Sequence, residues 1–255
     1  RRGLYPKHHR GKKMKKLYII GIGPGGEEDF TLGMIRALEA SEVIVGYKPY
    51  LNYIKNYTAG KEIYTTGMKS EIERCKMALA SAEAGKTTAM VSTGDAGLYG
   101  MAGPLLELAE GKDIAIEIIP GISANFAAAS CVGAPIMHDM VTISLSDLMT
   151  PLDLIKKRIR LAAQGDFVIC FYNPRSKGRP HYLKEAMAIL KEEGYEDTRP
   201  VAMVKHARRE GEEKIITTVG DLDDSFCDMN TMVIVGNKET YVQDGVMITP
   251  RGYRL

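Results

Sequence analysis

The stretch 92–98, which reads STGDAGL, places small residues and a carboxylate where a strand gives way to a helix. The uncharged run 88–91 before it is typical of a strand buried on both faces of a parallel sheet. Open α/β folds bind ligands at the carboxyl ends of such strands, where backbone groups and an acceptor such as Asp95 are accessible. The stretch therefore indicates a cofactor site, although glycines that only allow a turn with positive φ would give the same pattern.

A second glycine loop, Gly21–Gly26, follows the apolar run 17–20 and matches the spacing GxGxxG. That spacing is typical of dinucleotide sites, in which a pyrophosphate binds at the start of the next helix. Here Pro24 removes one backbone donor, and three acidic residues follow at 27–29. The loop therefore favours a ligand without phosphate or one with positive charge, and a nicotinamide-dependent oxidoreductase is a distant alternative.

Candidates for proton transfer and anion binding lie in the second half of the chain. His138 precedes Asp139, and a histidine beside a carboxylate can titrate near neutrality and move protons, although a hydrogen-bonded interface histidine is the more common arrangement. Cationic residues follow two predicted strand ends. These residues are Arg175, Lys177, Arg179, Arg208 and Arg209. They could form a basic entrance for an acidic substrate, or they could be ordinary solvated surface charges.

Composition narrows the class of protein. The chain has 255 residues, a net charge of +2 and four widely spaced cysteines, and no apolar run approaches the ~18 residues that span a bilayer. These features predict a cytoplasmic protein with reduced thiols and with no metal, membrane or nucleic-acid partner. The basic segment 1–13 lacks the apolar core of a signal peptide, and we expect it to be a disordered extension.

Strand and helix patterns alternate through most of the chain, which predicts an α/β fold with mostly parallel sheets. The three strands that end near Gly23, Asp95 and Ser123 should share one rim of a sheet. The alternation restarts after Gly133-Ala134-Pro135. We therefore expect an amino-terminal domain over 14–137 and a carboxy-terminal domain over 138–255, the latter with a more antiparallel pair at 214–219 and 231–235.

Six motifs in order, GIGPGG, STGDAGLYG, PGISA, FYNPRSK, PVAMVKHA and MITPRGY, resemble the tetrapyrrole methylases. These are class III methyltransferases that use S-adenosylmethionine and release S-adenosylhomocysteine. The resemblance extends from Met14 onward and implies two unlike α/β domains, a cofactor cleft between them and a homodimer. A sulfonium donor without phosphate also suits a glycine loop that is followed by acids.

The resemblance implies cofactor contacts at eleven positions, namely Pro24, Thr93, Gly94, Asp95, Leu98, Ser123, Ala124, Tyr172, Asn173, Ala207 and Thr231. Two positions depart from the family pattern. Gly26 stands where many relatives have aspartate, and Ala96 stands where proline often follows the Gly-Asp pair. An acidic contact at the first loop would then have to come from Glu27.

The segments SLSDLMTP, YNPRSKGR and MITPRGY are similar to the branch that methylates C(17) and contracts the macrocycle, with precorrin-3B or cobalt-factor III as its acidic substrate. Methyl transfer needs mainly alignment, whereas ring contraction moves protons. The candidates for that second task are His138, Asp147, Arg175 and His206. Other methylation positions, C(11), C(20) or uroporphyrinogen III, and a non-catalytic tetrapyrrole carrier are the alternatives.

Overall fold

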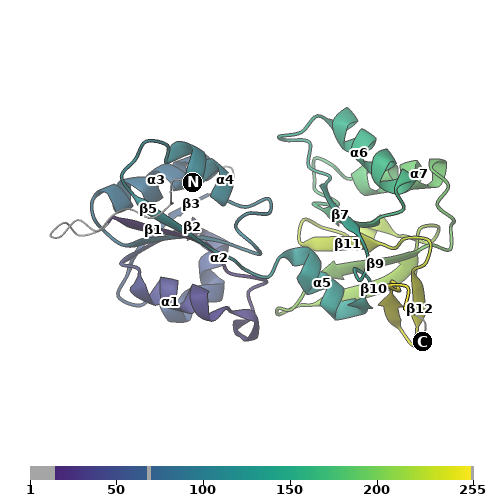
Figure 1. The fold of residues 1–255 in the computed structure, drawn as a ribbon, viewed down its shortest axis with the longest axis horizontal. Coiled ribbons are helices and arrows are strands. Elements are labelled where there is room, and N and C mark those ends of the chain that lie inside the picture. Colours follow the sequence, from purple (N-terminus) through teal and green to yellow (C-terminus); the bar gives the residue numbers. More distant parts are fainter. Residues whose placement is uncertain (1–14, 68–69, 254–255) are drawn as a thin grey trace. The chain divides into compact units, whose positions relative to one another are not determined.

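The computed structural model describes residues 15–67 and 70–253, so the basic extension 1–13 lies outside the described residues. The chain divides into two compact units, the first ending at Ser123 and the second beginning at Ala124. This boundary lies fourteen residues before the one expected from the sequence, which separated 14–137 from 138–255. Figure 1 shows the elements of each unit.

The first unit is built on a five-stranded sheet in the order β3-β2-β4-β1-β5, and every pair in it is parallel. Its strands are β1 (Lys16–Gly21), β2 (Val43–Tyr47), β3 (Glu62–Thr66), β4 (Thr88–Ser92) and β5 (Ala115–Ile119). Its helices are α1 (Leu32–Ala40), α2 (Lys48–Leu51), α3 (Glu71–Glu83) and α4 (Ala102–Leu108), with short 3-10 turns η1 (Glu27–Asp29) and η2 (Asn52–Tyr57).

Both faces of this sheet are covered, as its apolar strands require. Alternate residues of β1 point to opposite faces, so that Leu17 and Ile19 pack with α3 and α4 while Ile20 packs with α1. All five residues of β4 are buried. Helices α3 and α4 therefore form one outer layer and α1 with α2 the other (Figure 1).

The second unit has a five-stranded sheet in the order β10-β9-β11-β8-β7 and a small sheet in the order β12-β13-β6. The main strands are β7 (Met140–Ser144), β8 (Val168–Tyr172), β9 (Pro200–Lys205), β10 (Glu213–Thr218) and β11 (Thr231–Val235). The small sheet contains β6 (Gly133–Ala134), β12 (Tyr241–Gln243) and β13 (Val246–Ile248). The remaining elements are α5 (Ala124–Val132), α6 (Leu152–Gln164), α7 (Tyr182–Glu192) and η3 (Asp224–Phe226).

The expectation of mostly parallel strands does not extend to this second sheet. Only the pair β7 and β8 is parallel, whereas β11 runs antiparallel to both β8 and β9, and β10 antiparallel to β9. The reason lies in the connections, because β9 and β10 are joined by a short loop at 206–212, and such hairpin connections can join only antiparallel neighbours. The segments 214–219 and 231–235, expected to form an antiparallel pair, do not pair with each other: each runs antiparallel to β9, which lies between them.

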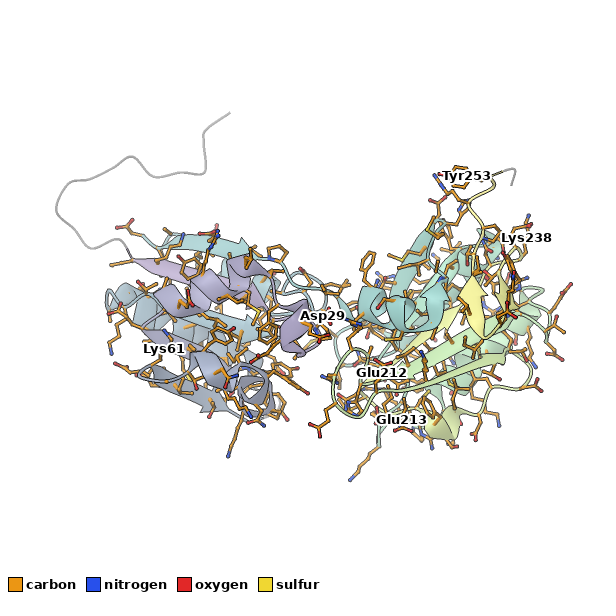
Figure 2. All side chains as sticks on the ribbon, turned by 90° about the horizontal axis from the view of Figure 1, so that it is seen from below. Asp29, Lys61, Glu212, Glu213, Lys238 and Tyr253 are labelled. Atoms are coloured by element: carbon orange, nitrogen blue, oxygen red, sulfur yellow. The ribbon has the colours of Figure 1, made fainter. Side chains whose placement is uncertain are left out.

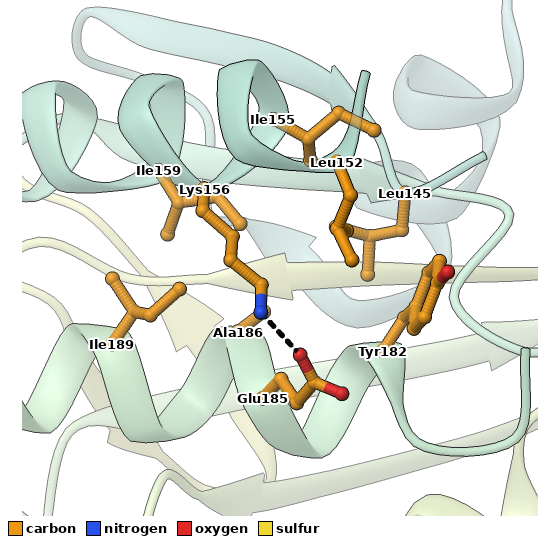
Figure 3. A pocket seen from close by; sticks show the side chains of 9 residues that line it. All are labelled: Leu145, Leu152, Ile155, Lys156, Ile159, Tyr182, Glu185, Ala186 and Ile189. Carbon is orange, nitrogen blue, oxygen red and sulfur yellow. Dashed lines mark ion pairs between the residues drawn. The ribbon is translucent and has the colours of Figure 1, made fainter. Parts of the chain in front are cut away.

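Helices cover both faces of the second sheet. One face packs against α6 and α7, and the other against α5 and β13, through residues such as Ala128, Val132 and Met247. Because α5 buries its apolar side on this sheet, it belongs to the second unit, which explains the earlier boundary. A small gap between α6 and α7 is lined mainly by apolar side chains and bridged by Lys156 and Glu185, whose Nζ and Oε2 atoms lie 2.7 Å apart (Figure 3).

Candidate functional site

The carboxyl ends of three neighbouring strands form one rim of the first sheet, as predicted. Strand β1 lies between β4 and β5, so the loops after Gly21, Ser92 and Ile119 leave the sheet side by side. Beyond the strands, Gly23 and Gly94 exchange two backbone hydrogen bonds of 3.0 and 2.8 Å. The glycine loop and the STGDAGL loop are therefore joined directly through their backbones.

The third loop of this rim approaches the other two without room for a side chain. A Cβ atom on Gly121 would lie 2.3 Å from the carbonyl oxygen of Gly94 and 2.5 Å from that of Gly21. A Cβ on Gly21 would in turn meet the same oxygen of Gly94 at 2.7 Å. Only glycine fits at these positions, because real Cβ atoms do not come this close to backbone atoms.

Asp95 links the same loops through its side chain. Its Oδ1 atom accepts a hydrogen bond of 2.8 Å from the amide of Gly97, and its Oδ2 atom accepts one of 3.1 Å from the amide of Gly121. The carboxylate predicted to contact a cofactor thus also links two loops of the rim. Around it, Pro24 and Ser123 are buried, and partly buried positions are Thr93, Gly94 and Leu98.

The predicted residues of the second unit gather at one edge of its main sheet. Strands β7, β8 and β9 point in the same direction, and β11 starts where they end. Thr231 pairs with Lys205 on β9, two residues before Ala207. On the other side, β11 pairs with β8 through Val233 and Phe171. Continuing this antiparallel register by two residues places Thr231 opposite Asn173. The topology therefore brings Tyr172, Asn173, Ala207 and Thr231 together.

A polar network, buried at Asn125 and partly buried at Tyr172, connects this edge to the start of α5. The hydroxyl of Tyr172 accepts a hydrogen bond of 3.2 Å from the amide of Asn125 and donates one of 3.3 Å to its Oδ1 atom. The Asn125 side chain also donates to Thr142 on β7. Asn125 is 1% exposed and directly follows Ala124. Sequence reasoning missed it, although it is a polar residue in an otherwise small and apolar helical stretch.

Strained backbone is concentrated at the same edge. Of the six non-glycine residues with positive φ in the described part of the chain, three follow β8 or β9, namely Asn173 at +52°, His206 at +49° and Arg208 at +60°. Such conformations cost free energy and persist where surrounding contacts enforce them, which happens most often at binding and catalytic sites. Their clustering marks this edge independently of the motifs.

The four residues predicted for proton transfer are not brought together as a group. Asp147, Arg175 and His206 follow the ends of β7, β8 and β9, whereas His138 precedes β7 and so lies at the opposite end of that strand. His138 is exposed, and its Nδ1 atom accepts a hydrogen bond of 2.8 Å from the amide of Asp139. Its predicted role is not supported by a neighbouring candidate on this sheet.

Asp147 and Arg175 already have protein partners. The hydroxyl of Tyr182 donates to Oδ2 of Asp147 at 2.8 Å, and this bond, assisted by Arg179, lowers the pKa of Asp147. The carboxyl is therefore ionised at neutral pH and suits a base better than an acid. Arg175 donates at 2.7 Å to the backbone oxygen of Asp224 and at 3.3 Å to its side chain, so its charge is partly neutralised.

Two further features of the described residues bear on metal ions and membranes. Histidine, cysteine, aspartate and glutamate side chains do not gather there in any group of three or more that could hold a metal ion. The helices within 15–67 and 70–253 lack the length and apolar character that a membrane span requires.

The sequence is similar to those of known proteins. Residues 16–223 match the family model of the Tetrapyrrole (Corrin/Porphyrin) Methylases. This chain belongs to the tetrapyrrole methylase family. A relative from Salmonella typhimurium, named probable cobalt-factor III C(17)-methyltransferase, is 53% identical over 94% of the chain and 100% of its own length. Precorrin-3B C(17)-methyltransferase from a Sinorhizobium species is 37% identical over 93% of the chain and 96% of its own length.

The solved structures include a tetrapyrrole methylase with the same architecture. The methyltransferase CobJ superposes with a TM-score of 0.87 at 36% identity, over 92% of this chain and 99% of its own. The predicted family and α/β fold are therefore confirmed, and the chain is a methyltransferase of the tetrapyrrole methylase family.

Proposed function

We propose that this chain methylates C(17) of cobalt-factor III, with contraction of the macrocycle, and uses S-adenosylmethionine as the methyl donor. The observation that carries the proposal is the 53% identity to a relative named for that reaction, over the whole length of that relative. The lower identity of 37% to a precorrin-3B enzyme makes the cobalt-free substrate the second candidate.

The rim of the first unit fits such a donor. Three backbone loops in close contact at Gly21, Gly94 and Gly121 offer amide and carbonyl groups, and Pro24 removes a donor that a phosphate would need. The acidic turn Glu27–Asp29 beside them is unfavourable for a pyrophosphate and tolerable for a cation. The residues that would hold the donor are those predicted from the family.

S-adenosylmethionine supplies a methyl group on a sulfonium sulfur, and the macrocycle supplies the carbon nucleophile. The chain contributes mainly alignment, which can lower the barrier by ~7–11 kcal/mol. For proton movement during contraction we propose Asp147, Arg175 and His206 ahead of His138, because the first three follow strands that end at one edge. We also propose that the chain forms a homodimer in the cytoplasm and binds the acidic macrocycle there.

The proposal is tested by incubating the purified chain with ¹³C-methyl-labelled S-adenosylmethionine and one macrocycle, cobalt-factor III in one reaction and precorrin-3B in another. We expect a ring-contracted product from cobalt-factor III that carries the label at C(17) by NMR. Turnover of precorrin-3B alone would move the assignment to the cobalt-free substrate. Label at C(11) or C(20), or macrocycle binding without transfer, would contradict the proposal. Fluorescence titration with NADH tests the oxidoreductase alternative, for which we expect no binding.

A further inference from the structure

The loop that joins β9 to β10 carries Ala207, one of the proposed cofactor contacts. It holds that residue between two left-handed neighbours, His206 at φ +49° and Arg208 at φ +60°. Neither has the conformational freedom of glycine, so this backbone is costly unless other contacts compensate. The position of Ala207 therefore depends on whatever holds His206 and Arg208 in place.

Among the contacts that hold these flanking residues are hydrogen bonds from both of their amides. The amide of His206 donates at 3.3 Å to the carbonyl oxygen of Asn230, immediately before Thr231. The amide of Arg208 donates at 2.8 Å to Oε2 of Glu212, at the far end of the same loop. The bond to Glu212 is the shorter, and its acceptor is charged, which strengthens it relative to a neutral pair.

Glu212 also ties the loop to a second element. Its Oε2 atom accepts from the Sγ atom of Cys131 on α5 at 3.3 Å, and Lys214 donates to the backbone oxygen of Cys131 at 2.6 Å. Burial, together with the hydrogen bond to Glu212, raises the pKa of the Cys131 thiol, which keeps it protonated and able to donate. The helix that begins at Ala124 thus contacts, near its other end, the loop that carries Ala207.

We propose that Glu212 is a positioning residue for the methyl donor: it holds the strained 206–209 backbone against α5 and so sets the position of Ala207. This inference rests on the proposed function, because it concerns the same cofactor site. Glu212 itself does not have to touch the donor. Its removal should weaken donor binding and leave the chemical step largely unchanged once the site is saturated.

The experiment compares Glu212→Ala and Glu212→Gln with the unmodified chain, using calorimetry with S-adenosylhomocysteine and steady-state kinetics with the donor. We expect Glu212→Ala to raise the Kd and the donor KM by five- to twentyfold, with kcat within twofold. Glutamine keeps an acceptor oxygen, so Glu212→Gln should raise the Kd less than threefold. Hydrogen exchange of the Arg208 amide should become faster in Glu212→Ala.

The matched control is Glu213→Ala. Glu213 is the exposed carboxylate that follows Glu212 in the chain (Figure 2). Its Oε1 atom lies 3.9 Å from the Nζ atom of Lys205. We expect its Kd to stay within twofold of the unmodified chain. An equal rise of the Kd in Glu212→Gln and Glu212→Ala would indicate a direct charge effect and would overturn the positioning role. An unchanged Kd in Glu212→Ala would overturn it as well. If the unmodified chain itself fails to bind S-adenosylhomocysteine, the proposed function fails and this inference with it.

Discussion

The Oδ2 atom of Asp95 lies 3.1 Å from the amide nitrogen of Gly121, which donates a hydrogen bond to it from the neighbouring loop. The other oxygen of the same carboxylate accepts from Gly97 within its own loop. One side chain therefore fixes the spacing of two loops that carry predicted cofactor contacts. A substitution there should affect binding through loop geometry as well as through any direct contact.

Asp95→Ala should weaken S-adenosylmethionine binding at least tenfold, which corresponds to about 1.4 kcal/mol. The substitution leaves the amides of Gly97 and Gly121 without their acceptor. Calorimetry with S-adenosylhomocysteine measures the change, and Asp113→Asn, at an exposed carboxylate of the same unit, is the control. Equal affinities in Asp95→Ala and the unmodified chain would refute the role of Asp95 in the site.

Gly121→Ala should destabilise the chain by about 1–3 kcal/mol, the usual cost of overpacking, and abolish donor binding. The added methyl group would collide with two carbonyl oxygens at the rim. Gly103→Ala provides the contrast, because Gly103 lies in α4 with no atom within 4 Å of an added Cβ. We expect Gly103→Ala to be neutral or to stabilise by up to about 1 kcal/mol, as measured by urea denaturation.

Tyr172→Phe should lower the free energy of unfolding by about 1–3 kcal/mol, the cost of leaving buried polar groups without a partner. The Tyr172 hydroxyl is shared with the amide and side chain of Asn125. Tyr64→Phe removes an exposed hydroxyl bound to Glu62 and should change little. The double substitution Tyr172→Phe with Asn125→Ala should lower the free energy of unfolding by less than the sum of the two single effects. Strictly additive effects would argue against the network.

The loss of folding free energy at acid pH should depend on Asp147. Folding lowers the pKa of this carboxyl, first through the Tyr182 hydroxyl and then through Arg179. Its ionised form therefore stabilises the fold above the ordinary value of about 3.9, and the contribution is lost as pH falls through the lowered value. Asp147→Asn should flatten the loss of stability in acid, measured by urea unfolding at several pH values. Tyr182→Phe should produce a smaller change of the same kind.

Arg175→Ala should raise the KM of the tetrapyrrole substrate with little change in donor affinity, if the side chain contributes to a basic entrance for an acidic substrate. Because Arg175 is bound to Asp224, the substitution should also destabilise the fold. Asp224→Asn separates the two effects, since it keeps the arginine and weakens only the ion pair. A lower stability with an unchanged KM in Arg175→Ala would show that the residue is only structural.

Much of the first unit could be predicted from the sequence. The buried run at β4 and its glycine-rich continuation gave the correct rim, because a fully apolar strand between turn residues is a strong local signal. Strand β3 was missed, since its residues EIYTT lie at the edge of the sheet and are almost entirely exposed. Without a buried face, such a segment lacks the periodicity that identifies strands.

The second unit was harder to predict. The direction of its strands depends on short connections such as the loop 206–212, and the early boundary depends on which sheet α5 covers. Both are tertiary properties with no local signature. The roles of Asn125 and Glu212 follow from partners distant in the sequence, 47 residues away at Tyr172 and 81 residues away at Cys131. Single-sequence patterns carry no information about such pairings.

The four free cysteines differ in solvent accessibility, which allows one of them to be labelled selectively. Cys75, Cys170 and Cys227 are buried, and burial raises the pKa of both Cys170 and Cys227 to about 12, which makes them poor nucleophiles. The pKa of the Cys131 thiol is also raised, so accessibility is what distinguishes it: Cys131 alone among the four is partly accessible. A maleimide fluorophore should therefore attach at a single site in the native protein, directly beside the Ala207 loop, and report on that loop without any engineered residue.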